Sequence, residues 1–296
     1  MLRKRLLASL FMIAPLLVFL WLDTNDTTNF GFPGFWVVPI ILAFGLAVAG
    51  ELVAMLRERT PGAAPWVVYL GVVFCHAGVI APEILGLPER GPLVRIGCCG
   101  VGLIAALAGA FLYELRNFHP DHHATTKLAL TLFVTLYAGW TLSFLSAMRV
   151  SLENHKGIVA LFSVLFIIKL SDAGAYFAGK QFGRHKLAPV LSPGKTMEGL
   201  VGGFIAAVLA SGIIFYAVMP QVVSGYSAAW PAVLGYAFSL AAVGVIGDLS
   251  ESLIKRDMHR KDSSQWLPGL GGIMDTADSV ILNAPVAFLW WSSGLL

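Results

Sequence analysis

Charged residues are scarce in this sequence. Asp, Glu, Lys and Arg make up only 12% of its 296 residues, whereas hydrophobic residues make up 57%. This balance excludes an ordinary soluble domain. Cysteine is also rare, and the number and positions of Cys75, Cys98 and Cys99 exclude a disulfide framework and a cysteine metal site. No clear internal repeat or low-complexity segment is present. The composition therefore predicts a polytopic membrane protein.

Apolar runs long enough to cross a bilayer as helices, about 20 residues each, occur about nine times. The first follows Arg3-Lys4-Arg5 but has no small-residue cleavage site, so we expect an uncleaved span. Pro82-Glu83 interrupts the third run. The predicted fold class is all-α, with about nine transmembrane helices. They cover residues 6–22, 36–56, 65–80, 94–113, 128–148, 158–178, 200–219, 232–246 and 272–291.

The distribution of cations predicts the orientation of these spans. With the N-terminus in the cytosol, 15 of the 20 Lys and Arg residues fall in inner segments, and only Arg90, Arg95, Arg149 and Lys156 fall outside. The C-terminus is then outside. A bacterial inner membrane and an organelle membrane both fit this topology, and the short loops and absence of a transit peptide favour the bacterial one.

Polar residues divide the chain into two predicted regions. Residues 1–156 hold about five spans whose loops contain no recognisable motif. Residues 157–296 hold the remaining spans and all of the specific polar motifs, so we expect them to form a catalytic region with a site facing the cytosol.

The most charged stretch is SLIKRDMHRKDSSQWLPGLGGIMDTAD, residues 252–278. Its cations suit phosphate oxygens, its aspartates suit a divalent cation, and its Gly271-Gly272 pair lets backbone approach a ligand. A cytosolic loop that follows the positive-inside rule would explain the cations alone. The combination favours a site that binds a nucleotide and a metal.

Two further stretches carry polar groups beside the membrane. Asp172 lies about 12 Å inside the inner end of its helix, and Lys169 on the same face is able to pair with it. Such a carboxylate either forms a buried ion pair or faces a wet cavity. Gly174, Gly179 and Gly183 follow, and glycines in membrane helices commonly permit close packing.

The second of these stretches is the loop of residues 184–203. It contains Gly194-Lys195-Thr196 but lacks the first glycine of a Walker motif, because Pro189 stands there. We expect a Ser-Pro-Gly-Lys-Thr turn that leads into a helix and is able to hold an anion. The alternative is that Ser192 or Thr196 acts as a plain helix cap.

Carboxylates from three helices are predicted to meet at the cytosolic side. Asp248 closes the eighth span, while Asp275 and Asp278 share one helical face and join Asp172. Carboxylates that face one another are usually held together by a cation, and oxygen ligands without clustered His or Cys favour magnesium over zinc. The sequence therefore predicts a magnesium site, with room for a second cation.

These motifs also carry a resemblance to a known family. The stretch 252–278 resembles the C-terminal signature of the phosphatidate cytidylyltransferases, in the order Ser, Lys-Arg, Lys-Asp, Pro-Gly, Gly-Gly, Asp and Asp. The resemblance continues backward through Gly247-Asp248, Ser192-Pro-Gly-Lys-Thr196 and Asp172-Ala-Gly-Ala-Tyr176, and it covers about the last 130 residues. The first 150 residues resemble the family only in being hydrophobic spans.

The resemblance implies transfer of CMP from CTP to phosphatidic acid, giving CDP-diacylglycerol and pyrophosphate. It implies magnesium bound by Asp248 and Asp275, with Asp172 and Asp278 nearby as catalytic residues. Lys195, Lys255 and Arg256 would neutralise the triphosphate or the lipid phosphate. The remaining implied substrate-binding residues are Ser192, Thr196, Asp262, Gly271 and Gly272.

The sequence departs from the family pattern at two positions. Leu270 stands where the family commonly has His, and Thr276 where it commonly has Arg, so this chain lacks whatever contribution that His and that Arg make in the family. Two alternatives stay open: a cytidylyltransferase for another lipid phosphate, and a transporter or channel that uses Asp172 and Lys169. We expect no nucleic-acid partner, and a homodimer is compatible with the sequence.

Overall fold

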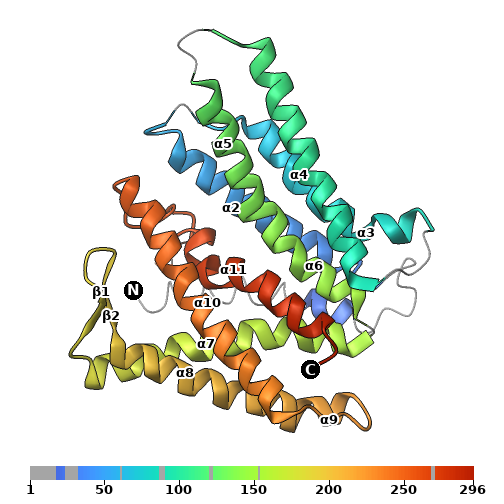
Figure 1. Ribbon diagram of the computed structural model, residues 1–296, viewed down its shortest axis with the longest axis vertical. Helices are drawn as coiled ribbons and strands as arrows, with labels where there is room; N and C mark the ends of the chain where they lie inside the picture. The colour runs from blue at the N-terminus through green and yellow to red at the C-terminus, as the bar shows by residue number, and fades with distance from the viewer. Residues whose placement is uncertain are drawn as a thin grey trace. The chain divides into compact units, whose positions relative to one another are not determined.

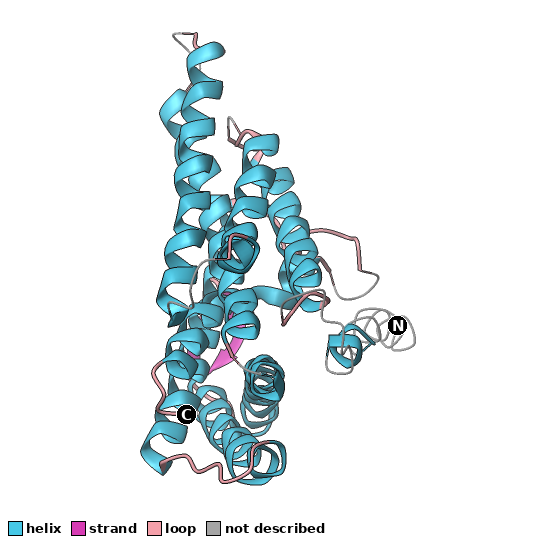
Figure 2. Ribbon diagram, turned by 90° about the vertical axis from the view of Figure 1, so that its right-hand side faces the viewer, coloured by secondary structure: helices cyan, strands magenta, loops and turns pink. Residues whose placement is uncertain are grey.

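A computed structural model describes residues 18–23, 33–60, 62–86, 91–119, 123–152, 154–267 and 271–296. Most of these residues lie in helices, as predicted (Figure 2). A short antiparallel pair of strands, β1 (Lys186–Ala188) and β2 (Ser192–Thr196), is an addition to the expected all-α architecture.

Seven helical segments within the described ranges are long and apolar enough to cross a membrane. The chain is therefore an integral membrane protein by the length and composition of its helices. The segments are α2 (Val37–Leu56), α3 (Pro65–Ile84), α4 (Gly91–Arg116), α5 to α6 (Ala124–Val134, η2 Thr135–Trp140, Thr141–Ser151), α7 (Asn154–Phe182), α8 to α9 (Met197–Gly212, η3 Ile213–Val218, Met219–Val222) and α10 (Trp230–Asp257).

These seven segments coincide with seven of the nine predicted spans. Most of the first predicted span, at 6–17, lies outside the described residues. The ninth forms a helix, α11 (Ile273–Ser292), that is not among the seven candidate spans. The helix α3 runs through Pro82 to Ile84, so this proline does not end the third span.

The chain divides into two compact packing units, which are described one at a time. The first comprises residues 1–151 and 258–276, and the second comprises residues 152–257 and 277–296. The charged stretch of residues 252–278 is divided between them: residues 258–276 belong to the first unit, and residues 252–257 and 277–278 to the second.

Small residues let α3 and α4 of the first unit approach closely. A Cβ added at Gly102 would lie 2.5 Å from Cys75 N, and one added at Gly78 would lie 2.6 Å from Cys98 C. Close approach at small residues is typical of membrane helices. Cys75 and Cys99 are buried free thiols, and Cys98 is a partly buried one.

One predicted loop cation is buried in the first unit. Arg149, counted above among the cations of outer loops, lies on α6 and its Nε is 2.5 Å from Asp23 Oδ2. Both side chains are almost wholly inaccessible, at 2% and 0% exposure. Arg149 therefore forms a buried ion pair rather than a solvated loop charge.

Glycines also set the packing of α7 against α8 in the second unit (Figure 1). A Cβ at Gly174 would lie 2.7 Å from Gly202 O, and one at Gly199 would lie 2.8 Å from Ala175 O. Cβ atoms at Gly179 and Gly183 would both crowd Thr196. The predicted close helix packing is confirmed at Gly174, whereas Gly179 and Gly183 make room for the side chain of Thr196, which caps α8.

The helices α10 and α11 meet along a polar and aromatic seam of the second unit. Asn283 Nδ2 donates to Leu240 O at 3.1 Å, and Trp291 Nε1 donates to Tyr236 OH at 3.3 Å. A Cβ at Gly247 would lie 2.6 Å from Asp278 O. This close contact brings the part of α10 that carries Asp248 next to Asp278 of α11.

The hairpin of β1 and β2 precedes α8. Lys186 is paired with Thr196, and Ala188 with Ser192. The Ser-Pro-Gly-Lys-Thr segment is thus the second strand of a hairpin and not the predicted turn. Thr196 ends this strand and caps α8, because its hydroxyl accepts a hydrogen bond from Gly199 N at 3.0 Å.

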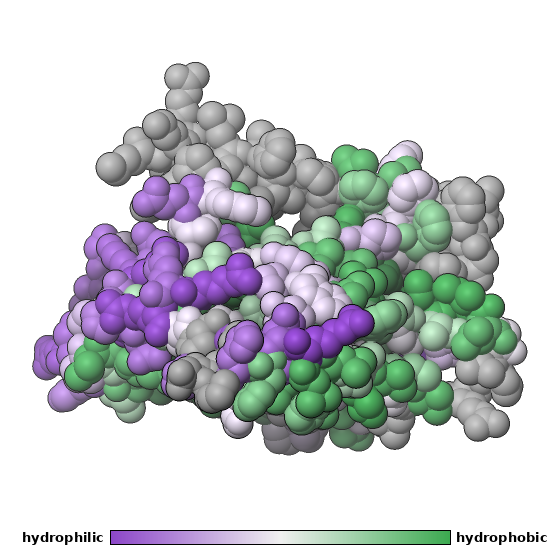
Figure 3. Space-filling view, turned by 90° about the horizontal axis from the view of Figure 1, so that it is seen from above, coloured by the Kyte–Doolittle hydropathy of each residue, from purple (hydrophilic) through white to green (hydrophobic). Residues whose placement is uncertain are grey.

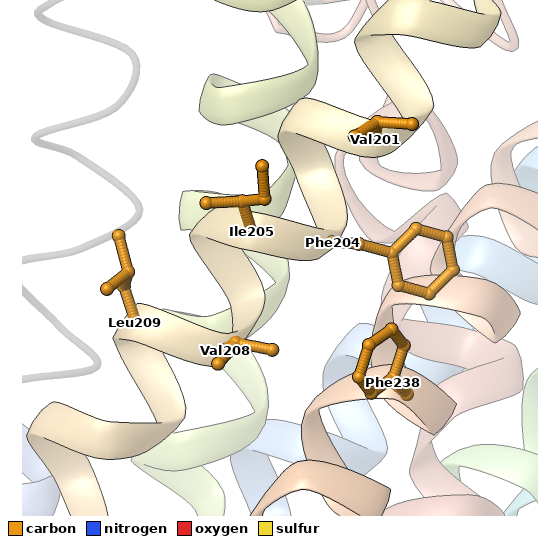
Figure 4. A pocket seen from close by; sticks show the side chains of 6 residues that line it. All are labelled: Val201, Phe204, Ile205, Val208, Leu209 and Phe238. Atoms are coloured by element: carbon orange, nitrogen blue, oxygen red, sulfur yellow. The ribbon is translucent and has the colours of Figure 1, made fainter.

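Apolar side chains are widely exposed, as expected of helices that face lipid, and many are seen in Figure 3. Within the second unit, α8 and α10 form an apolar groove of about 410 Å³, shown in Figure 4. The lining residues are Val201, Phe204, Ile205, Val208, Leu209 and Phe238.

Candidate active site

The centre of the candidate site in the second unit is an ion pair between β2 and α10. Lys195 Nζ lies 2.7 Å from Asp248 Oδ2. Both side chains are partly accessible, at 22% and 31% exposure, so a ligand can reach them. Ser252, one turn further along α10, lies at the edge of hydrogen-bonding distance, with its Oγ 3.5 Å from Asp248 Oδ1.

A second charged pair comes from α7. Lys169 Nζ lies 3.6 Å from Asp172 Oδ2, with both side chains about half exposed. The structure thus contains the predicted pair, but the pair is not buried. The charges of Asp248 and Lys195 also act on Asp172, so α7 faces the same group of charges as α10.

Asp278 brings α11 to this group. Its carboxylate interacts electrostatically with Asp248 and Lys169, and its Oδ1 accepts hydrogen bonds from the Ser279 backbone N–H at 2.5 Å and Ser279 Oγ at 3.0 Å. Asp172, Lys195, Asp248 and Asp278 therefore gather within the second unit. The sequence predicted that Asp172, Asp248, Asp275 and Asp278 meet; three of these lie in the second unit, whereas Asp275 belongs to the first. The catalytic roles of all of these residues stay predictions.

The two hydroxyls of the hairpin differ in accessibility. Thr196 is buried and its hydroxyl caps α8, which supports the helix-cap alternative for this residue. Ser192 is half-buried at the start of β2. Of the two, only Ser192 offers an accessible hydroxyl, so it is the better candidate for a ligand contact.

The predicted phosphate-binding cations of α10 have different surroundings. Lys255 Nζ lies 2.6 Å from Glu251 Oε2, one helical turn away, and both side chains are largely buried. Arg256 is exposed near the end of the helix. Arg256 is thus on the accessible surface, and Lys255 would have to exchange its carboxylate partner for an anion.

In the first unit, Asp275 holds the backbone that leads into α11. Its Oδ2 accepts hydrogen bonds from Ser263 N and Ser263 Oγ, both at 2.9 Å, and from Gly272 N at 2.7 Å. Asp275 is the third residue of α11, so its bond to Gly272 has the form of a capping box. This predicted metal ligand therefore has a structural role as well.

Local packing in the first unit explains why glycines occupy positions 271 and 272. Gly271 has a φ of +89°, and a Cβ there would lie 2.5 Å from Asp275 Oδ2. A Cβ at Gly272 would lie 2.0 Å from Ser263 Oγ. Close approach of polar side chains therefore explains both glycines without a ligand. Asp262, the other predicted residue of this loop, is exposed, and Leu270 lies outside the described residues.

Sequence reasoning missed Glu51, a buried carboxylate on α2 with 5% exposure. It accepts hydrogen bonds from Ser263 and Ser264 and from the first two N–H groups of α11. The signal in the sequence was a single carboxylate within an apolar span. Carboxylates in such a position are costly and usually have a specific partner.

The described part of the chain contains no group of three His, Cys, Asp or Glu side chains that could hold a metal ion by themselves. Magnesium is usually bound by one or two carboxylates together with water and substrate phosphates. The oxygen donors of Asp248 and its neighbours fit that chemistry, because a phosphate would complete the coordination.

Comparison with known proteins places these motifs in a family. The chain is 38% identical to the phosphatidate cytidylyltransferase of Haemophilus influenzae over 133 residues. This matched segment covers 45% of this chain and 46% of that protein. It is 35% identical over 164 residues to the Chlamydia pneumoniae protein of the same name. That segment covers 54% of this chain and 53% of the relative. The chain thus spans about half the length of these two relatives.

A third relative matches over a longer segment. The phosphatidate cytidylyltransferase of Staphylococcus aureus (strain COL) is 35% identical over 205 residues, which cover 69% of this chain and 73% of that protein. The model of the cytidylyltransferase family matches residues 3–293, and so includes the N-terminal spans. The chain therefore belongs to the cytidylyltransferase family.

Proposed function

We propose that this protein is a phosphatidate cytidylyltransferase, which transfers CMP from CTP to phosphatidic acid and releases CDP-diacylglycerol and pyrophosphate. The observation that carries the proposal is the accessible ion pair of Lys195 and Asp248 in a chain of this family. The charges of Asp172 and Asp278 act on the same region. A cation among carboxylates suits a substrate that carries both phosphates and a metal.

The proposed reaction needs no nucleophile from the protein. A phosphate oxygen of phosphatidic acid attacks the α-phosphorus of CTP, and the bond between that phosphorus and the bridging oxygen to the β-phosphate breaks. The lipid phosphate is already ionised near neutral pH, so a general base is not required. The protein's task is then to position two anions in line and to neutralise their charge.

The cations of the second unit would supply this neutralisation. Lys195 would leave Asp248 and bind a phosphate oxygen, and the exposed Arg256 would bind a second anionic group. Lys255 would contribute if it exchanges Glu251 for phosphate. Ser192, accessible on β2, would donate a hydrogen bond to the nucleotide, and Asp262 would accept one.

Magnesium is the proposed cofactor. Asp248 would hold it in the second unit, while Asp275 as a ligand remains a proposal from the sequence. When bound, magnesium would neutralise phosphate oxygens and stabilise the charge that develops on the leaving pyrophosphate. Asp172 and Asp278 would orient the groups around Asp248 through their own charges.

The proposed setting is a bacterial inner membrane, with nine spans, a cytosolic N-terminus and the site facing the cytosol. The excess of Lys and Arg in the predicted inner segments supports this orientation. The bacterial origin of the relatives named above agrees with it. Fusion of a reporter to each terminus would test the orientation, and opposite locations of the two termini are expected.

Incorporation of labelled CTP into lipid tests the proposed function. The purified protein is mixed with phosphatidic acid micelles, with and without magnesium. We expect CDP-diacylglycerol and pyrophosphate in equal amounts, and only when magnesium is present. Product from a prenol phosphate or an ether-lipid phosphate, but not from phosphatidic acid, would replace the proposed substrate. Absence of any cytidylyl transfer by the folded protein would overturn the proposal.

A further inference from the structure

Glu51 links an apolar N-terminal helix to the start of α11. Its Oε1 accepts hydrogen bonds from Ser264 Oγ at 2.6 Å and from Ile273 N at 2.9 Å. Its Oε2 accepts from Ser263 Oγ and Met274 N, both at 2.9 Å. All of these residues belong to the first packing unit. Four donors from segments more than 200 residues away in the sequence thus converge on one buried carboxylate.

The four bonds match the capacity of a carboxylate, which offers about four acceptor sites and no donor. Ile273 and Met274 are the first two residues of α11, whose N–H groups have no acceptor within the helix. A negative charge at this end also interacts favourably with the helix dipole. Glu51 therefore provides from another helix the cap that Gly272, which has no side chain, cannot provide.

The same contacts fix Asp275. Ser263 Oγ lies 2.9 Å from Glu51 Oε2 and 2.9 Å from Asp275 Oδ2, so the two carboxylates share the single proton of one hydroxyl. Gly272 N donates to Asp275 Oδ2 as well, and a Cβ at Gly272 would lie 2.4 Å from Glu51 Oε2. A displacement of Glu51 would therefore change the hydrogen bonds that orient Asp275.

We propose that Glu51 is a positioning residue for the cytidylyl transfer: its carboxylate holds Ser263, Ser264 and the first turn of α11, and thereby sets the direction of Asp275. This inference rests on the proposed function. It assigns a specific role to the N-terminal part of the chain, whose spans otherwise carry no recognisable motif.

The test compares Glu51→Gln, Glu51→Asp and the wild type as full-length proteins in detergent. Glutamine keeps the shape but presents an NH₂ group to donors, so two of the four bonds are lost. We expect Glu51→Gln to lower kcat about 10-fold to 100-fold, as substitutions behind a ligand commonly do, and to raise the magnesium concentration for half-maximal rate. The KM for phosphatidic acid should not change. Glu51→Asp keeps the charge and should restore part of kcat.

Hydrogen exchange gives a second measurement that needs no activity. Peptides that contain Ile273 and Met274 should exchange faster in Glu51→Gln, while peptides from α3 and α4 should not. The matched control is Glu58→Gln, which removes a carboxylate that pairs with Arg260 on the exposed surface of the same unit. This pair is accessible and should contribute little, so kcat and exchange at α11 should stay near wild type.

Two results would overturn the proposal: a wild-type kcat and magnesium dependence in Glu51→Gln, or faster exchange throughout the first unit, which would mean a general structural role. A wild-type protein with no cytidylyl transfer would instead remove the proposed function. In that case, exchange at Ile273 and Met274 would still decide whether Glu51 holds the start of α11.

Discussion

Lys195 Nζ and Asp248 Oδ2 lie 2.7 Å apart, which joins the hairpin before α8 to the C-terminal part of α10. The pair is partly accessible, so its contribution to stability is small and it can exchange partners with a ligand. Asp172 and Asp278 act electrostatically on the same region. A phosphate that binds Lys195 would release Asp248 for a metal ion, and this coupling leads to the first two predictions.

The first prediction concerns Asp248→Asn. The substitution keeps the size of the side chain but removes the charge, so it should lower kcat about 100-fold or more while the protein remains folded in detergent. The labelled-CTP assay and thermal unfolding measure the two effects. Asp257→Asn, at the exposed end of the same helix, is the control and should retain activity. Near-wild-type turnover in Asp248→Asn would remove the metal role assigned to it.

The second prediction concerns Lys195→Ala. Loss of the ammonium group removes a phosphate partner, so the apparent KM for CTP should rise about 10-fold, equivalent to a single charge-assisted contact. The amount of protein inserted in the membrane should not change. The control is Lys186→Ala. Lys186 lies in the same hairpin, and its Nζ donates to Pro193 O at 2.8 Å. An unchanged CTP dependence in Lys195→Ala would move this residue out of the site.

Hydropathy alone predicted much of the fold. The run at 36–56 became α2 at Val37–Leu56, because an apolar segment in a bilayer must satisfy its backbone within one helix. The cap at Thr196 and the packing of the α7 glycines were also predictable, since both depend on residue type and spacing along one segment. The predicted meeting of Asp172, Asp248, Asp275 and Asp278 rested on the expected order of the spans, and it holds for the three that lie in the second unit.

Features that depend on distant contacts were not predictable in the same way. The bond from Ser263 to Glu51 joins residues 212 positions apart, and no local pattern marks it. Arg149 was predicted in a loop because its partner Asp23 lies far away in the sequence. The hairpin was missed because Ser192-Pro-Gly-Lys-Thr196 has the composition of a turn, while its pairing depends on Lys186 and Ala188.

The third prediction separates the two roles of Asp275. Asp275→Asn removes the charge and places an amide where Oδ2 faces three donor groups, of which the Ser263 hydroxyl is shared with Glu51. We expect loss of turnover together with a lower Tm, because donors left without an acceptor cost about 1–3 kcal/mol. Asp248→Asn should lose turnover with little change in Tm. Turnover at the wild-type rate in Asp275→Asn would exclude it as a ligand, and an unchanged Tm would exclude its role in holding the loop.

The fourth prediction concerns the glycine contact of α7 with α8. In Gly202→Ala, the new Cβ would lie 2.3 Å from Ala178 Cβ and 2.9 Å from Gly174 O, and neither of these atoms can move by rotation of a side chain. The two helices must separate, which should cost about 1–3 kcal/mol and lower the Tm in detergent.

Gly212→Ala, at the end of α8, is the matched control, because its Cβ would have no neighbour within 4 Å. Alanine is also the better helix former there, so this variant should be at least as stable as the wild type. Because α8 begins at Thr196, next to Lys195, Gly202→Ala should also raise the apparent KM for CTP. Equal Tm values for the two variants would mean that α7 and α8 do not approach as closely as these distances require.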